Sequence, residues 1–235
     1  MAFYTLICKF AELLSKGMRT RTVIVIVAFL LAAVWFFFPV GKPEGESLPF
    51  ALRLALPAFL LALGGIRLVP GLMTLGFFFC AIGDAMGVLG SFEGQMAGFA
   101  LAHICFIWHF LRNIWKPHPV ILIATTLLCS PPLVVAAKKV IPHVKDIPIR
   151  IGCIIYALLL TGTLWTSIVR TFSGKKDSKV LPAIAALGAL FFLVSDFVLS
   201  WNKFTEHIPH ASLYIMTTYY AALLLLFIGT LRPSK

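Results

Sequence analysis

The sequence predicts an all-α protein, a polytopic transmembrane helical bundle of about eight spans. Three observations lead to this prediction. First, 60% of the 235 residues are hydrophobic and only 12% are charged, whereas soluble domains are about half apolar and roughly a quarter charged. Second, apolar stretches near the ~20 residues that cross a bilayer recur with short polar breaks. Third, a helix satisfies its own backbone hydrogen bonds in lipid, so helices are the expected spans.

Each apolar stretch is interpreted as one helix, bounded by the polar, Gly or Pro residues beside it. The second and third stretches are separated only by Val69-Pro70-Gly71, which is typical of a tight turn. The breaks 41–49 and 171–179 have loop composition. No separate soluble domain is visible, so residues 22–231 are predicted to form a single transmembrane bundle domain. The predicted spans are 22–40, 50–69, 71–90, 95–112, 119–137, 148–170, 180–200 and 211–231.

The N-terminus has basic residues followed by the apolar stretch Val23–Val40, an order that signal peptides share. This stretch is long enough to span a bilayer, and no Ala-x-Ala cleavage signal follows it. It therefore indicates an uncleaved first helix. Residues 1–21 are predicted to form a cytoplasmic N-terminal segment that lies at the membrane interface.

The basic residues favour a particular orientation in the membrane. The formal net charge of +11 would indicate nucleic-acid binding in a soluble protein, but here Lys and Arg gather between the apolar stretches, where they orient helices. No nucleic-acid partner is therefore expected. With eight spans both termini share a side, and that side holds 13 of the 20 Lys and Arg residues. Both termini are predicted to be cytoplasmic, in a bacterial inner membrane or an endoplasmic reticulum. The sequence leaves a homo-oligomer open.

Two stretches resemble each other at an offset of 112 residues. The segment from Leu75 to Phe92 aligns with the segment from Leu187 to Phe204, with 5 identities in 18 positions. The alignment superposes Asp84 on Asp196, the only acids inside apolar spans. A four-helix offset preserves direction, so the pattern predicts a parallel internal repeat.

Asp84 and Asp196 are the strongest functional candidates. An ionisable residue in the middle of a span costs a few kcal/mol to insert and usually faces the bundle interior. Each lies about 20–24 Å along its helix at ~1.5 Å per residue, so both reach the same, non-cytoplasmic half of the membrane. Two carboxyls near one cavity suit acid/base chemistry, because one can hold a proton while the other is ionised. Proton relay or transport and a purely structural role remain alternatives.

Five other side chains are predicted, on weaker signals, to contribute to substrate binding: His103, Tyr219, Tyr220, Asn202 and Lys203. His103 lies inside the fourth span, where a hydrogen-bonded core histidine is the simpler interpretation. Tyr219 and Tyr220 on the eighth span are core or interface aromatics by default, although either hydroxyl could donate a hydrogen bond into a cavity. Asn202 and Lys203 lie at a membrane boundary, where the lysine could meet a phosphate head group or simply anchor the helix. Small residues on the third and fourth spans favour close helix packing.

Several common catalytic and metal-binding patterns are absent. The sequence has no His-Glu-x-x-His or His-x-x-x-His pattern and no His cluster, so an intramembrane zinc site lacks its ligands. It also has no Gly-x-Ser-x-Gly elbow. The five cysteines form no Cys-x-x-Cys pair and are interpreted as small core residues: Cys8, Cys80, Cys105, Cys129 and Cys153. No metal or organic cofactor is expected.

Two blocks of about 85 residues together resemble the YhhN family of lysoplasmalogenases, which includes animal transmembrane members. The resemblance rests on motifs in four spans: Gly83-Asp84; Phe99 with His103; Gly188 to Phe192 with Ser195-Asp196, followed by Asn202-Lys203-Phe204; and Thr218-Tyr219-Tyr220. The chain departs from the family at Leu223, where a Gln is common. It also has Lys42-Pro43 before the second span, where the family often has a Lys-Pro entering it.

The resemblance implies an activity. Members of this family hydrolyse the vinyl ether bond of lysoplasmalogens, which are lysophospholipids, and release a fatty aldehyde and glycerophosphocholine or glycerophosphoethanolamine. Asp84 and Asp196 would correspond to the acids regarded as catalytic, with the lysophospholipid bound nearby. A proton-coupled transporter or lipid carrier that uses the same two acids is the alternative, although no paired broken helices mark a transport route. A non-catalytic membrane scaffold is a third interpretation.

Overall fold

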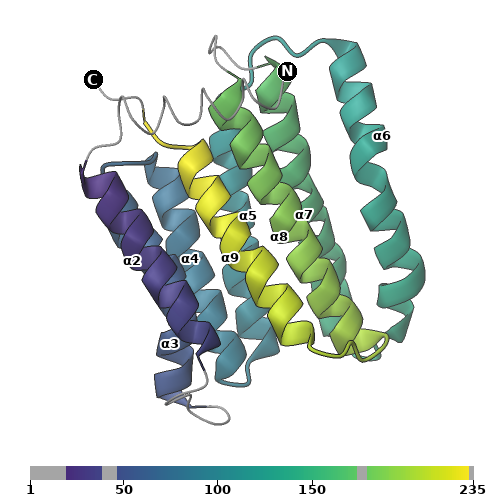
Figure 1. Cartoon of the computed structure of the whole chain (residues 1–235). Coiled ribbons are helices and arrows are strands. Elements are labelled where there is room, and N and C mark those ends of the chain that lie inside the picture. Colours follow the sequence, from purple (N-terminus) through teal and green to yellow (C-terminus); the bar gives the residue numbers. More distant parts are fainter. Residues whose placement is uncertain (1–19, 39–46, 174–178, 233–235) are drawn as a thin grey trace.

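The structure is a computed structural model that describes residues 20–38, 47–173 and 179–232. The described residues form eight long α-helices and no strand (Figure 1). A π-helical turn, η1, and a 3-10 turn, η2, follow the fifth helix. The elements are α2 (Thr20–Phe37), α3 (Leu48–Gly65), α4 (Gly71–Val88), α5 (Phe92–Leu111), α6 (Pro119–Val135), η1 (Ala136–Val140), η2 (Ile141–His143), α7 (Ile147–Ser173), α8 (Val180–Phe204) and α9 (Ala211–Gly229).

The eight predicted spans are confirmed as helices that are long and apolar enough to cross a membrane. Their limits differ from the predicted ones by only a few residues, as in the fourth, which begins at Phe92 instead of residue 95. The loop predicted at 41–49 and the segment predicted at 1–21 lie mostly outside the described residues, and α2 already begins at Thr20. The internal repeat stays a prediction.

Local signals in the sequence set several helix ends. Gly90 has a φ of 81° after the end of α4, a left-handed conformation that glycine adopts without steric cost. The side chain of Ser91 then accepts a hydrogen bond from the Gly94 backbone N–H at 3.1 Å and so caps α5. Together these residues make the tight turn between α4 and α5.

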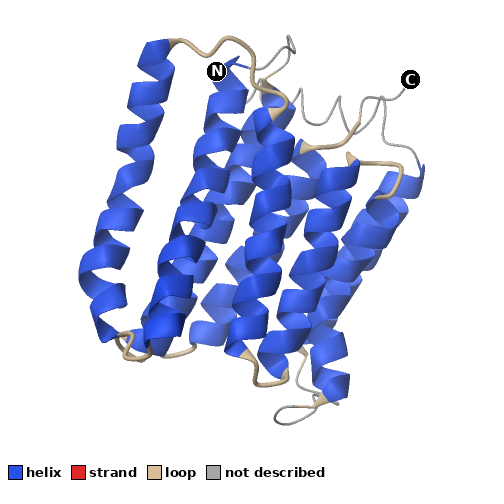
Figure 2. Ribbon diagram, turned by 180° about the vertical axis from the view of Figure 1, so that it is seen from behind, coloured by secondary structure: helices blue, strands red, loops and turns tan. Residues whose placement is uncertain are grey.

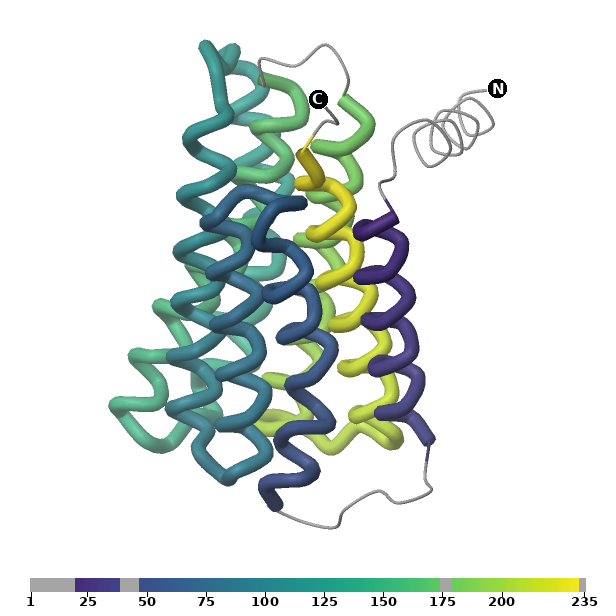
Figure 3. Tube along the Cα trace, turned by 90° about the vertical axis from the view of Figure 1, so that its left-hand side faces the viewer, coloured from purple at the N-terminus to yellow at the C-terminus, as the bar shows by residue number. Residues whose placement is uncertain are grey.

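Consecutive helices pack against each other, except for α5 and α6. The most extensive contacts join α8 to α9, α4 to α5 and α3 to α4, but α5 packs against α7 rather than α6. Figure 3 shows α3 beside α9, which is distant in sequence. Buried side chains from α2 to α5 and α7 to α9 form one continuous core, to which α6 adds only Cys129.

Helix α6 stands at the edge of the bundle (Figure 2). It packs on α7, and only Thr125 and Cys129 of its residues are buried. Pro131 and Pro132 lie within it and lack a backbone N–H, and the helix passes into the π-helical turn η1 a few residues later. The C-terminal end of α6 and the turn η1 therefore depart from regular α-helical geometry where they lie beside α7 and α8.

The helices alternate in direction, so α2 begins and α9 ends at the same end of the bundle (Figure 1). The Arg232 backbone N–H donates to the Leu68 carbonyl at 2.8 Å, which ties the end of α9 to the α3–α4 turn. We call this end the N/C end. The two described chain ends thus lie on one side, as the span count predicts.

Candidate active site

Asp84 lies in the last turns of α4 and is buried, with 3% of its surface exposed. The Tyr219 hydroxyl of α9 donates a hydrogen bond to Asp84 Oδ2 at 2.8 Å. The Tyr219 ring is held edge-on between Phe99 of α5 and Phe192 of α8, with centroid distances of 5.7 and 5.4 Å. Aromatic residues of α5 and α8 thus fix the position of Tyr219, the hydrogen-bond partner of Asp84.

Asp196 lies on α8 and is also buried, with 8% exposure. The Tyr156 hydroxyl of α7 donates to Asp196 Oδ2. The neighbouring Ser195 is buried and donates to the Ile215 carbonyl of α9 at 3.0 Å, which fixes the rotation of α8 at this level. A tyrosine from a different helix therefore holds each acid.

The surroundings of the two acids are connected through packed side chains. Phe192 packs against Tyr219, the partner of Asp84, at 5.4 Å between ring centroids. The same ring packs against His103 at 4.7 Å, and His103 lies beside Tyr156, the partner of Asp196. Neither carboxyl faces the surrounding lipid, because both are buried between helices. Five helices, α4, α5, α7, α8 and α9, contribute side chains here.

His103 of α5 is fully buried next to this pair. Its Nδ1 lies 2.9 Å from Thr163 Oγ1 of α7, and its Nε2 lies 3.5 Å from the Tyr156 hydroxyl. The ring also packs edge-on against Phe192, 4.7 Å between centroids. A chain of polar groups thus runs from Thr163 through His103 and Tyr156 to Asp196.

An apolar pocket reaches Asp196 from the side of α6. It holds about 770 Å³ of empty space, including its mouth, and α5, α6, η1, α7 and α8 form its walls. Asp196, Tyr156, Thr161 and Ser200 are the residues with oxygen-bearing side chains in an otherwise mainly hydrophobic lining. Asp84 does not line this pocket. The apolar lining includes Phe92, Met96, Phe99, Leu133, Ala136, Val140, Ala157, Leu160, Leu193, Phe197 and Phe204.

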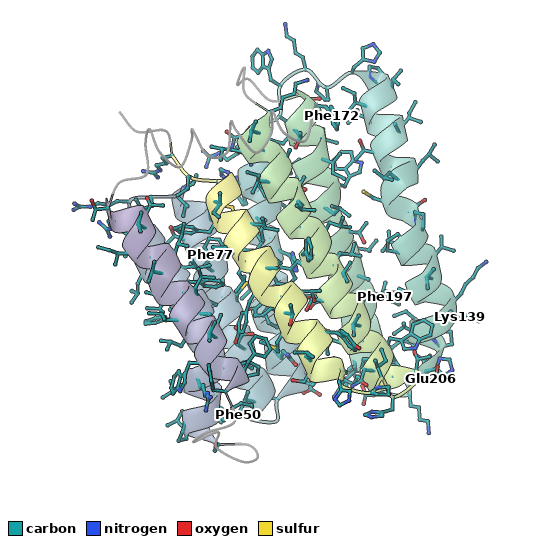
Figure 4. All side chains as sticks on the ribbon, in the orientation of Figure 1. Phe50, Phe77, Lys139, Phe172, Phe197 and Glu206 are labelled. Carbon is teal, nitrogen blue, oxygen red and sulfur yellow. The ribbon has the colours of Figure 1, made fainter. Side chains whose placement is uncertain are left out.

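The pocket lies in the half of the bundle away from the N/C end. Figure 4 labels Phe197, which lines the pocket, nearer to Lys139 and Glu206 at that far end than to Phe172 at the N/C end. The pocket therefore lies in the half of the bundle opposite the two described chain ends.

Lys203 lies beside the pocket lining. It follows Asp196 by seven residues, so both lie on one face of α8 about 10 Å apart along the axis. Its Nζ lies 4.4 Å from the ring centroid of Phe92, which lines the pocket together with Phe204. The lysine itself is exposed. A positive charge therefore stands beside the apolar opening.

Two of the predicted site residues have other surroundings. The Tyr220 hydroxyl donates to the Leu54 carbonyl at 3.2 Å, and its ring packs edge-on against Phe29 and Phe36. Asn202 Oδ1 accepts from the Ile208 backbone N–H at 2.8 Å and holds the turn between α8 and α9. The structure brings neither into contact with the pocket.

Sequence reasoning missed Tyr156, Thr163 and the pocket. Tyr156 lies in the apolar run Ile154-Ile155-Tyr156-Ala157, where nothing distinguishes it from an interface aromatic. The only available signal was its position as the one tyrosine of that span. Among the described residues, no three His, Cys, Asp or Glu side chains gather in a way that could hold a metal ion.

Comparison with known proteins places this site in a family. The model of the YhhN family matches residues 48–230, which includes every residue of the site. The chain belongs to the YhhN family. The YhhN match begins at Leu48, the first residue of α3, and so excludes α2.

Several curated relatives are named lysoplasmalogenases. The chain is 35% identical to lysoplasmalogenase TMEM86B of Homo sapiens over 154 residues, which are 65% of this chain and 60% of that protein. It is 30% identical to lysoplasmalogenase TMEM86B of Rattus norvegicus over 213 residues, 88% of this chain and 84% of that protein. It is 26% identical to lysoplasmalogenase TMEM86A of Homo sapiens over 169 residues, 68% and 65% of the two. No solved structure matches the chain.

Proposed function

We propose that this protein is a lysoplasmalogenase, which hydrolyses the vinyl ether bond of lysoplasmalogens with Asp84 and Asp196. The observation that carries the proposal is the position of Asp196 on the wall of an apolar pocket, where its partner Tyr156 and the partner of the second buried acid, Tyr219, both belong to one packed cluster around Phe192 and His103. Membership of the YhhN family and the name that its curated relatives share support the same activity.

The pocket suits a lipid with one long chain. Its lining is almost entirely hydrophobic, with a few polar side chains at one place, which is the usual character of sites that bind apolar small molecules. An alkenyl chain can therefore be buried along α5, α7 and α8. The substrate already resides in the bilayer, so a site within the membrane spares it transfer through water.

Lys203 and Asp196 fit the two ends of the polar part of such a lipid. A phosphate bound by the Lys203 ammonium at the rim would leave the glycerol backbone to extend along α8 towards Asp196. The two residues are about 10 Å apart along the helix, and the flexible lysine side chain can adjust this span. The vinyl ether, which joins the glycerol to the chain, would then lie at Asp196 while the chain fills the apolar wall.

The chemistry follows from two carboxyls that hold one proton, because two close carboxylates in an apolar interior do not both ionise readily. Asp196, which reaches the pocket, gives the proton to the alkene carbon farther from the ether oxygen. The π electrons form the new C–H bond, and the ether oxygen shares a lone pair to give an oxocarbenium ion. The carboxylates of the pair then stabilise this cation.

Water completes the reaction. The ionised Asp196 accepts a proton as water adds to the oxocarbenium carbon, which gives a hemiacetal and restores the carboxylic acid. The hemiacetal loses its hydroxyl proton and its bond to the glycerol oxygen breaks as that oxygen is protonated. The products are a fatty aldehyde and a glycerophosphocholine or glycerophosphoethanolamine. The net reaction consumes one water and requires no oxidant or reductant.

The test is aldehyde release by purified protein in detergent from lysoplasmenylcholine and lysoplasmenylethanolamine. We expect Asp196→Asn and Asp84→Asn each to lower kcat at least ~100-fold, the usual contribution of a general acid or base. Glu206→Gln is the matched control, because it makes the same kind of change at an exposed acid that is not part of the pocket lining. Its activity should equal that of the wild type.

Two results would contradict the proposal. One is wild-type protein that is folded but releases no aldehyde from either lipid. The other is full turnover in both Asn variants. Solute flux in proteoliposomes without aldehyde formation would instead favour the proton-coupled transporter.

A further inference from the structure

The polar chain from Asp196 to Thr163 is not used by the mechanism proposed above. Tyr156 donates to Asp196 and lines the pocket, whereas His103 and Thr163 lie beyond it and are buried. Buried polar groups usually make all the hydrogen bonds that they can. The positions of the protons in this chain can therefore be assigned from the pattern of donors and acceptors.

The assignment starts at Thr163. Its hydroxyl donates to the Leu159 carbonyl one turn earlier, at 3.1 Å. A hydroxyl has one proton, so towards His103 Nδ1, at 2.9 Å, it acts as acceptor and Nδ1 carries the hydrogen. A neutral imidazole then has a bare lone pair on Nε2. That lone pair faces the Tyr156 hydroxyl at 3.5 Å.

Tyr156 consequently has one proton and two acceptors, Asp196 Oδ2 on one side and His103 Nε2 on the other. When Asp196 is ionised, the phenol donates to it, as in the structure. When Asp196 is protonated, its own O–H can donate to the phenol oxygen, and the phenol proton can turn to His103 Nε2. Only a rotation of O–H bonds separates the two arrangements, and no donor is left without an acceptor in either.

We propose that Tyr156 and His103 form a hydrogen-bond switch that accommodates Asp196 in both its protonated and its ionised form. This inference rests on the lysoplasmalogenase activity proposed above. In it, Tyr156 and His103 are positioning residues, which act on the substrate only through Asp196. The switch allows Asp196 to act first as acid and then as base within one turnover. Without His103, the Tyr156 hydroxyl would have no second acceptor for its proton when the protonated Asp196 donates to the phenol oxygen.

The remaining titratable groups around Asp196 are the same in every variant described below. They include Cys153 of α7, which lines the same pocket, and Asp84 of α4 with its partner Tyr219 of α9. None of them changes between the variants, so a difference between the variants reports on Tyr156 and His103.

The experiment compares Tyr156→Phe, His103→Leu and His103→Gln. We expect Tyr156→Phe and His103→Leu to lower kcat for aldehyde release roughly 10- to 100-fold with little change in KM, because a buried hydrogen bond is lost but the apolar wall is kept. His103→Gln should retain most of the wild-type kcat. The Gln carbonyl can accept from Tyr156, and its amide can donate to Thr163.

A second measurement is independent of turnover. The infrared carbonyl band of the protonated Asp196 carboxyl, identified by its loss in Asp196→Asn, should shift in Tyr156→Phe and His103→Leu and remain in place in His103→Gln. This band can be recorded even if the protein releases no aldehyde. Absence of wild-type activity would therefore contradict the lysoplasmalogenase proposal, and the band would still decide about the switch.

The proposed switch is contradicted if the carbonyl band of Asp196 stays unshifted in both Tyr156→Phe and His103→Leu. It is also overturned if His103→Leu keeps wild-type kcat, or if His103→Gln loses as much kcat as His103→Leu. Melting temperatures of all variants in detergent accompany the kinetics, and a purely structural role would lower them without separating the Gln variant from the Leu variant.

Discussion

At the scale of single residues, the site depends on tyrosines that partner buried acids. A carboxyl buried in a membrane bundle is costly unless it is hydrogen-bonded. Tyr219 meets this need for Asp84, and Tyr156 meets it for Asp196. Because each tyrosine comes from another helix, the acids also fix how α4 and α9, and α7 and α8, are rotated against each other.

The role of Lys203 gives a prediction at this scale. Lys203→Met keeps the apolar stem beside Phe92 but removes the charge at the rim of the pocket. We expect KM for a lysoplasmalogen to rise roughly 10-fold with kcat little changed, because an exposed ammonium contributes modestly to phosphate binding. Steady-state kinetics of aldehyde release measures both constants.

Lys139→Met is the matched control, since Lys139 is an exposed lysine at the same end of the bundle. Its KM should remain that of the wild type. An equal rise in KM for both variants would indicate general attraction of the lipid to basic residues, and an unchanged KM in Lys203→Met would exclude Lys203 from phosphate binding.

At the scale of helices, glycine residues determine how closely α4 approaches α5 and how closely α8 approaches α9. A methyl group at Gly98 of α5 would lie 2.7 Å from the Gly83 backbone nitrogen of α4. A methyl group at Gly229 of α9 would lie 2.3 Å from the Ala185 nitrogen of α8. Contacts between backbones cannot relax by turning a side chain, so both pairs depend on the absence of a Cβ. Asp84 directly follows Gly83, so the α4–α5 contact also sets the position of this acid.

Gly98→Ala should therefore separate α4 from α5. We expect a loss of about 1–3 kcal/mol of unfolding free energy, as for other overpacked sites, together with reduced aldehyde release. Thermal or denaturant unfolding in detergent measures the first effect. Gly71→Ala is the control, because nothing lies within 4 Å of its added methyl group. Equal stability of the two alanine variants would show that the close approach is not required.

At the scale of the whole molecule, the bundle places its chemistry in one half. Both acids, the pocket and Lys203 lie away from the N/C end, and the pocket borders on α6, the helix least embedded in the bundle. Lipid in that half of the membrane is thus the nearest source of substrate for the proposed reaction.

Orientation in the membrane can be predicted from charge. The eight-span topology assigns 13 of the 20 Lys and Arg residues to the side of the two termini, and the side with more basic residues faces the cytoplasm. Reporter domains fused to the N-terminus and to the C-terminus should both report a cytoplasmic location. Two reporters on opposite sides would contradict the eight-span topology, and two outside reporters would place the pocket in the cytoplasmic half.

The sequence by itself determined the helical class, the eight spans to within a few residues, and the two acids as the most unusual side chains. These features are local, because hydropathy along ~20 residues decides whether a segment crosses lipid. An aspartate in such a segment is conspicuous wherever the helix lies.

Only the tertiary structure decided which side chains meet. All eight helices are apolar on most sides, so hydropathy could not reveal that α5 packs on α7 and leaves α6 at the edge. Helix pairing in lipid depends on the fit of small residues and on hydrogen bonds between helices, which are set by residues far apart in sequence. For that reason Tyr219 could be named as a candidate but not paired with Asp84, and Tyr156, an ordinary tyrosine in an apolar run, became recognisable only beside Asp196 and His103.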